Sequence, residues 1–255
     1  KNLSKKNSST IGNEKLTNWS LQEEDEAAFV KNLLEDQPFI PVYFSYDVEL
    51  NKKGAPNMSD AISAVKKASA SNLNKDFWII DVRKEHDFKE AHLPYSLNIQ
   101  EDGKFETWLG SIINPQEQFY LAAKDEEQLQ KLLLRVAAIG YETAVAGTLI
   151  ITQGEVKEPE PDIDAFKNHT DDYTIVDVRN KPEVAKEKIF ENSISIPLAE
   201  LRGRINEIPT DKPIVVHCAG GYRSAVASSM MSAKLDGAVE VFDLGDAVKE
   251  FQKEE

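Results

Sequence analysis

The chemistry of this sequence centres on Cys218, the only cysteine among 255 residues. It follows an apolar run at 214–216, which predicts a strand, and it precedes the paired glycines Gly220 and Gly221. From Ser224 onward, small and apolar residues predict a helix. A strand, a tight glycine-rich loop and a helix aim backbone N–H groups and a helix N-terminus at one point. A thiolate is stabilised at such a point, so we expect Cys218 to act as a nucleophile.

The length of this loop narrows the chemistry. Four residues separate Cys218 from Arg223, whereas cysteine phosphatases place five between these positions and so make room for a tetrahedral phosphate. The shorter loop suits a smaller guest, such as the terminal sulfur of a persulfide. The Cys-Ala-Gly-Gly-Tyr-Arg-Ser stretch at 218–224 resembles the active-site loop of the rhodanese (thiosulfate sulfurtransferase) family. That resemblance implies sulfur transfer through a persulfide on Cys218.

The rest of the loop is expected to bind the substrate. Its amides would point at the anionic persulfide, and each charge-assisted hydrogen bond would contribute about 1.5–3 kcal/mol. Arg223 would fix the loop or balance the anion, and Tyr222 would line the mouth of the site. The predicted substrate-binding residues are Ala219, Gly220, Gly221, Tyr222, Arg223 and Ser224.

Other polar residues near the loop have structural alternatives. His217 is expected to be a packed strand residue rather than a base, and Asp177 and Arg179 are expected to pair at a strand end. Arg202 and Arg204 leave two interpretations open, because they would either steer an anionic substrate or lie on a solvated helix face.

An internal repeat predicts the fold. Residues 77–83 are echoed by 173–179, each an apolar strand ending in Asp-Val-Arg, and 119–123 parallels 214–218. Helix-like stretches follow, at 126–138 and 224–235. We therefore predict the α/β class, with two rhodanese-like units, each a parallel sheet with helices on both faces. The predicted units span residues 58–152 and 160–255, joined by an exposed, acidic, proline-containing linker at 153–159. The family resemblance implies five strands per sheet.

The first unit lacks the reactive loop. The position of the cysteine falls on Ala122 or Ala123, and a charged stretch at 124–127 replaces the glycines and the arginine. Carboxylates at that place would repel thiosulfate or a persulfide anion. The first unit is therefore predicted to be inactive.

Residues 1–57 differ from the rest. We predict one amphipathic helix at 21–34, with Ser20 as its N-cap, and an extended segment at 37–51 between prolines. The stretches at 8–12, 18–19 and 48–51 resemble the carboxyl-terminal end of a metallo-β-lactamase-type hydrolase. Such an end, then an inactive and an active rhodanese unit, is the order found in persulfide dioxygenase–sulfurtransferase fusions. The resemblance implies the tandem rhodanese region of such a fusion, with the metal site of the hydrolase domain outside this chain.

The composition limits which binding partners and which cellular compartment are expected. The net charge of −14 argues against nucleic acid or an anionic membrane as partner. No apolar run approaches the ~20 residues needed to cross a membrane. The chain starts at Lys1 without a charged-then-apolar leader, so no signal peptide is predicted and the start is interpreted as a cut edge. A single cysteine fits a reducing cytoplasm. The four histidines lack the metal-ligand spacing of a metallo-hydrolase, so no metal or cofactor is predicted.

Three functions fit these residues. The first is a sulfurtransferase that takes sulfur from a small donor, thiosulfate or a low-molecular-weight persulfide, and passes it to a thiol acceptor. The second is a phosphatase on the same fold, against which the short loop argues. The third is a non-catalytic interaction module, or a sensor of sulfide or oxidants through Cys218. The sequence leaves homo-oligomerisation open.

Overall fold

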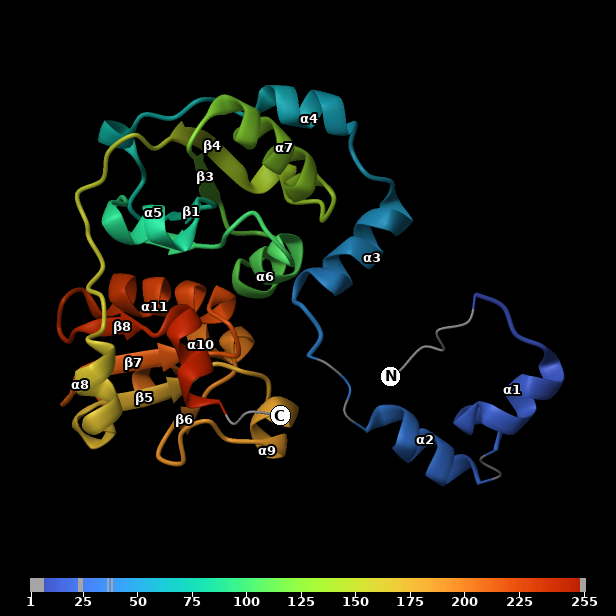
Figure 1. Cartoon of the computed structure of the whole chain (residues 1–255). Coiled ribbons are helices and arrows are strands. Elements are labelled where there is room, and N and C mark those ends of the chain that lie inside the picture. Colours follow the sequence, from blue (N-terminus) through green and yellow to red (C-terminus); the bar gives the residue numbers. More distant parts are fainter. Residues whose placement is uncertain (1–6, 23–24, 36, 38, 253–255) are drawn as a thin grey trace. The chain divides into compact units, whose positions relative to one another are not determined.

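A computed structural model of the chain describes residues 7–22, 25–35, 37 and 39–252 (Figure 1). The chain divides into two units, Lys1–Phe39 and Ile40–Glu255. Among the described residues, no helix is long and apolar enough to cross a membrane.

The smaller unit is helical. It contains α1 (Ile11–Thr17), a 3₁₀ turn at Trp19–Leu21 and α2 (Glu26–Leu34). The single helix predicted from residue 21 was wrong in its start, because α2 begins at Glu26. The Asp25 carboxylate caps it by accepting from Ala28 N at 2.8 Å, and Ser20 lies in the 3₁₀ turn instead. Residues 23 and 24 lie outside the described residues.

The larger unit contains two four-stranded parallel sheets of the same topology. The first has the order β2-β1-β3-β4 and the second β6-β5-β7-β8. Their strands are β1 (Trp78–Asp81), β2 (Ser96–Asn98), β3 (Phe119–Ala123), β4 (Val145–Ile150), β5 (Thr174–Asp177), β6 (Ile194–Ser195), β7 (Ile214–His217) and β8 (Val241–Asp243). Strands β1, β3, β5 and β7 are buried along their whole length, which explains their continuous apolar sequences.

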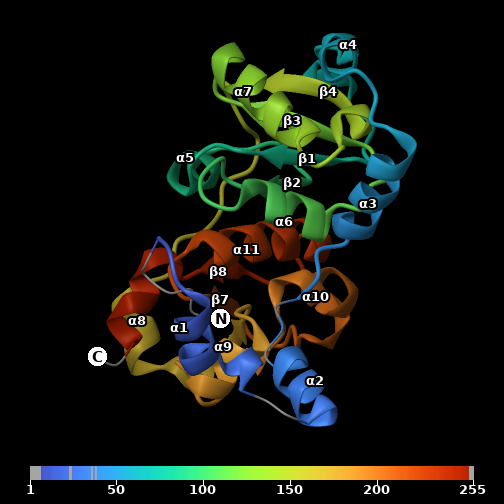
Figure 2. The same cartoon turned by 90° about the vertical axis from the view of Figure 1, so that its right-hand side faces the viewer.

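Helices flank each sheet, as Figures 1 and 2 show. They are α4 (Met58–Ala64), α5 (Glu85–Glu90), α6 (Phe105–Ile112) and α7 (Glu126–Ala137) around the first sheet, and α8 (Ile163–Asn168), α9 (Lys181–Lys186), α10 (Leu198–Arg204) and α11 (Tyr222–Leu235) around the second. The predicted α/β class with parallel sheets is confirmed. Each sheet has four named strands in the described part of the chain rather than five. An isolated parallel bridge between Lys67 and Thr148 extends the first sheet beyond β4.

The segment predicted to be extended at 37–51 was wrong, because most of it forms α3 (Tyr43–Lys53). Tyr43 and Tyr46 both contact the buried Tyr141 ring edge-on, at centroid distances of 6.5 and 6.1 Å. The Tyr46 hydroxyl also donates to Gly140 O at 3.2 Å. Residues three apart lie on the same face of a helix, so the helical conformation lets both tyrosines pack on Tyr141. This packing favours a helix over an extended segment. The predicted domain boundaries at 57, 152 and 159 stay predictions.

The linker at 153–159 is held against the unit that contains the first sheet. The backbones of His92 and Val156 form an antiparallel bridge, and Glu158 N donates to Lys89 O at 3.0 Å. The side chain of Glu158 accepts from the Ser232 hydroxyl of α11 at 3.0 Å. Because Glu158 is only 7% exposed, the linker predicted to be exposed is buried at this residue.

Candidate active site around Cys218

The loop after β7 turns sharply before α11. Cys218 follows the last strand residue, Ala219 and Gly220 are exposed, and Gly221 is the N-cap of α11 with φ +95°. This conformation is strained for a residue with a Cβ, so glycine is required at 221. The helix starts at Tyr222, two residues before its predicted start at Ser224.

Backbone amides converge on the sulfur of Cys218, as the sequence predicts. Gly221 N lies 3.2 Å and Gly220 N 3.5 Å from Sγ, and both donate to it. The Ser224 hydroxyl lies 3.7 Å from Sγ and itself donates to Gly221 O at 2.9 Å, which braces the turn. Cys218 is 2% exposed. The sulfur therefore sits beneath the loop, at the positive end of the α11 dipole.

Arg223 anchors the loop to α9. Its guanidinium makes two bonds to the Glu183 carboxylate, at 2.6 and 2.8 Å. Burial alone would lower the pKa of Arg223, but the hydrogen bond and charge of Glu183 outweigh it and raise this pKa. The Arg223 bond is also the main cause that lowers the pKa of Glu183. The pair is thus charged on both sides and fixes the loop; whether Arg223 also balances a substrate anion stays a prediction.

Tyr222 points toward the first unit. Its hydroxyl donates to Gln100 O at 2.8 Å, and burial is the main cause that raises its pKa. The Tyr222 hydroxyl therefore binds a backbone oxygen of the first sheet's unit. Whether the ring lines the mouth of the site stays a prediction.

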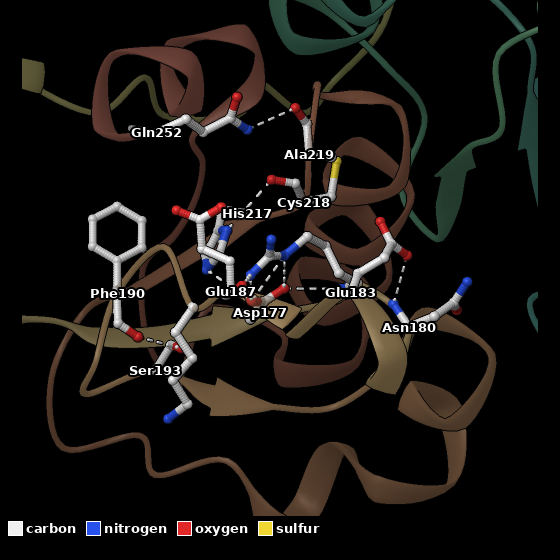
Figure 3. A network of polar contacts seen from close by, with 12 residues as sticks. Asp177, Asn180, Glu183, Glu187, Phe190, Ser193, His217, Cys218, Ala219 and Gln252 are labelled. Atoms are coloured by element: carbon white, nitrogen blue, oxygen red, sulfur yellow. Dashed lines mark hydrogen bonds and ion pairs between the residues drawn. The ribbon is translucent and has the colours of Figure 1, made fainter. Parts of the chain in front are cut away.

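The Asp-Val-Arg repeat is structural, as expected. Arg179 donates from Nε and a terminal nitrogen to Asp177, at 3.0 and 2.7 Å, and also reaches Glu187 O at 2.9 Å. Arg83 and Asp81 repeat this arrangement in the first unit. Figure 3 shows Asp177, at the end of β5, near His217, at the end of β7.

His217 is a packed strand residue. It is fully buried, and its Nε2 lies 3.7 Å from Asp177 Oδ2. Desolvation is the main cause that lowers its pKa, so the ring is neutral at pH 7. A neutral ring held within the strand fits the structural alternative rather than the role of a base.

Arg202 and Arg204 both form ion pairs with carboxylates. Arg202 makes two bonds, at 2.5 and 2.6 Å, to Glu117 of the first unit. Arg204 pairs with Glu200 and Glu207 on its own side of the unit, both at 2.7 Å. Carboxylates thus engage both guanidinium groups, and whether either arginine also steers an anionic substrate stays a prediction.

The first unit has carboxylates where the second has the glycines of its reactive loop. Asp81 pairs with Ala122 across its sheet just as Asp177 pairs with His217, so Ala123 is the counterpart of Cys218. Two residues later, the Asp125 carboxylate caps α7 by accepting from Gln128 N at 2.8 Å. The first unit thus has the carboxylates of Asp125 and Glu126 at the positions that Gly220 and Gly221 occupy in the second.

Sequence reasoning missed two residues at the loop. Glu183 completes a capping box with Asn180 at the start of α9, and the Asn-Lys-Pro-Glu sequence at 180–183 was a usable signal for that box. The Gln252 side chain donates to Ala219 O at 3.0 Å (Figure 3). No local pattern points to that contact, because 33 residues separate the partners.

Comparisons with known proteins place the second unit. Residues 162–254 match the family of rhodanese-like domains. The uncharacterized protein YqhL of Bacillus subtilis is 32% identical over 77 residues, which are 30% of this chain and 59% of that protein. A protein named sulfurtransferase from Allochromatium vinosum is 31% identical over 70 residues, 28% of this chain and 64% of that one. The chain thus spans about three fifths of the length of these curated relatives.

Two solved structures are similar over longer stretches. A metallo-beta-lactamase from Staphylococcus aureus is 28% identical, with a TM-score of 0.45, over 56% of this chain and 40% of that one. A thiosulfate sulfurtransferase from Pseudomonas aeruginosa is 14% identical, with a TM-score of 0.30, over 75% of this chain and 40% of that one. On the family match, the part of the chain that carries Cys218, residues 162–254, is a rhodanese-like domain.

Proposed function

We propose that this protein is a sulfurtransferase that carries sulfane sulfur on Cys218. The observation that supports it most is the pair of loop amides, Gly220 N and Gly221 N, directed at the only cysteine sulfur. The relative from Allochromatium vinosum that is named a sulfurtransferase is in agreement.

The proposed reaction has two displacements at sulfur. The Cys218 thiolate attacks the outer sulfur of thiosulfate, the sulfur–sulfur bond of the donor breaks, and sulfite leaves with the bonding electrons. An organic persulfide would react in the same way and release its thiolate. The enzyme now holds a Cys218 persulfide anion. An acceptor thiolate attacks the terminal sulfur, takes it as a new persulfide and restores the Cys218 thiolate.

The loop lowers the energy of the intermediate in this scheme. The terminal sulfur of the persulfide carries the negative charge, and amides already oriented toward Sγ need little rearrangement to reach it. Each such bond contributes about 1.5–3 kcal/mol. The N-terminus of α11 adds a favourable dipole. No metal or organic cofactor is part of the proposal.

A wider assignment follows from the resemblance of residues 1–57. We propose that the chain is the tandem rhodanese region of a persulfide dioxygenase–sulfurtransferase fusion acting in the cytoplasm on small sulfur donors and thiols. In that arrangement the two activities would share sulfur compounds.

The burial of Cys218 favours one alternative. A cysteine residue that is 2% exposed suits a sensor that is modified slowly and then signals to a partner. A sensor would form a persulfide without passing it to any acceptor.

The test is a steady-state assay with thiosulfate and excess thiol, in which a second thiol reduces the product persulfide to a disulfide and the released sulfide is measured. We expect turnover by the wild type and none by Cys218→Ser. A matched variant moves the cysteine to the first unit, as Cys218→Ser with Ala123→Cys. It should remain inactive because the carboxylates of Asp125 and Glu126 stand where the second unit has Gly220 and Gly221. Full activity of Cys218→Ser would refute the proposal, and hydrolysis of an aryl phosphate by the wild type would support the phosphatase instead.

A further inference from the structure

A carboxylate from the first unit packs against the reactive loop of the second. Glu85 is the first residue of α5. A Cβ built on Gly221 would lie 3.6 Å from Glu85 Oε2, and one built on Gly245 would lie 2.8 Å from Glu85 Oε1. Both glycines have positive φ, +95° and +54°. The turn that donates to Cys218 Sγ therefore lies against the backbone of Gly245 and Asp246 and beside Glu85, and the turn after β8 lies against the same carboxylate.

A largely covered lysine pairs with the Glu85 carboxylate. Lys89 Nζ lies 2.6 Å from Glu85 Oε1 and 3.0 Å from Asp243 Oδ2. The other oxygen of Asp243 accepts from Gly245 N at 2.9 Å. The side chains of Lys89 and Asp243 are 13% and 1% exposed. The ammonium thus joins α5 of the first unit to the β8 turn of the second.

Gln100 provides a second connection between the same parts. Its side-chain oxygen accepts from Glu85 N at 3.2 Å, and its backbone oxygen accepts from the Tyr222 hydroxyl at 2.8 Å. Tyr222 directly follows Gly221, so the first turn of α11 is held from the first unit on both sides. Figures 1 and 2 show α11 next to the unit that carries α5 and β2.

The group is also charged. Glu85 and Asp243 place two carboxylates beside one ammonium. Burial, followed by the charge of Asp243, raises the pKa of Glu85. Gly221 N lies 3.2 Å from Sγ, and a Cβ built on Gly221 would lie 3.6 Å from Glu85 Oε2. These distances and the two bonds between them place the Glu85 carboxylate within about 10 Å of Sγ. Replacing Glu85 with glutamine removes a charge near Sγ, whereas replacing it with alanine also removes the packing.

We propose that Glu85, on the unit without a cysteine, is a positioning residue for the chemistry at Cys218. Its side chain keeps the Gly221 turn in place, so that the Gly221 amide stays on the sulfur. The first unit is then part of the working site of the second. The kinetic part of this proposal rests on the proposed sulfurtransferase function, whereas the reactivity of the thiol does not.

The experiment compares Glu85→Ala with Glu85→Gln. Both variants lose the charge, but only alanine loses the packing, so their ratio isolates positioning. Because Cys218 is the only cysteine, its rate of alkylation by iodoacetamide reports on the loop directly. We expect the alanine variant to react on the order of tenfold more slowly than the glutamine variant at pH 7, the effect of one weakened amide–sulfur bond. The glutamine variant should react at least as fast as the wild type.

Glu90 offers a matched control on the same helix. Its side chain is 65% exposed, so Glu90→Ala and Glu90→Gln should react alike. Should Glu85→Ala not fold by circular dichroism, Tyr222→Phe replaces it. That variant loses only the bond to Gln100 and should react several-fold more slowly than the wild type. Equal rates for folded Glu85→Ala and Glu85→Gln, or an unchanged rate for Tyr222→Phe if it is the substitute, would overturn the proposal.

Measuring sulfur transfer by the same variants distinguishes the positioning role of Glu85 from the proposed sulfurtransferase function. If sulfur is transferred, kcat should follow the same order, with Glu85→Ala below Glu85→Gln and KM for thiosulfate nearly equal in the two. If the wild type transfers no sulfur while the alkylation ratio holds, the sulfurtransferase function is wrong and the positioning role of Glu85 stands.

Discussion

Replacing Gly221 with alanine should cost about 1–3 kcal/mol through backbone strain alone, because φ +95° and ψ −44° are sparsely populated for any residue with a Cβ. Steric clash adds little. The new methyl group would meet Gly245 C at 3.4 Å, Asp246 N at 3.5 Å and Glu85 Oε2 at 3.6 Å, which are ordinary contacts. If the turn relaxes to relieve the strain, the fraction of molecules with the Gly221 amide on Sγ falls by about 5- to 150-fold. If the turn holds, the same energy is lost from the free energy of unfolding.

Two measurements on one pair of variants test this reasoning. The rate of Cys218 alkylation at pH 7 reports relaxation of the turn, and urea denaturation reports loss of stability. Gly220→Ala is the control, because its new methyl group would have nothing within 4 Å and its φ is not positive. We expect the control to match the wild type in both measurements. A Gly221→Ala protein with unchanged reactivity and unchanged stability would refute the account of the loop.

Two further predictions concern the contacts around the loop and the linker. Glu183→Gln should lower the free energy of unfolding by about 1 kcal/mol at pH 7, a modest value because the Glu183 side chain is 38% exposed. Because Arg223 lowers the pKa of Glu183, the wild-type advantage is complete above the ordinary carboxyl pKa and disappears as pH falls through the lowered one. Urea denaturation of both proteins between pH 7 and pH 3 measures this, and a constant difference would contradict it. Gly154→Ala should lower stability by about 1–3 kcal/mol, since its Cβ would lie 2.6 Å from His92 O; an unchanged melting temperature would show that the linker can move away from His92.

Local sequence predicted the reactive loop well, because its parts are contiguous. The strand at 214–217, the paired glycines and the helix follow one another without interruption, and the Asp-Val-Arg repeat indicated the parallel sheets. The helix at 43–53 was missed because prolines before it suggested extended chain, while its tyrosines are selected by packing on Tyr141.

Contacts between the two sheets' units could not be predicted. Glu85 and Gly221 lie far apart in sequence, and nothing near Glu85 distinguishes it from other surface glutamates. The same holds for Tyr222, whose partner Gln100 is 122 residues away. Such pairs depend on how the repeated units dock, and one sequence without its structure does not specify that.

The central claim is that Cys218 carries sulfur, and the intact mass of the protein tests it most directly. After incubation with thiosulfate, the wild type should gain one sulfur atom. A thiol should then take this sulfur as a persulfide, and a second thiol should reduce that persulfide, forming a disulfide and releasing sulfide. Cys218→Ala should gain nothing. A wild-type protein that reacts with iodoacetamide but takes up no sulfur from thiosulfate or from an organic persulfide would contradict the account.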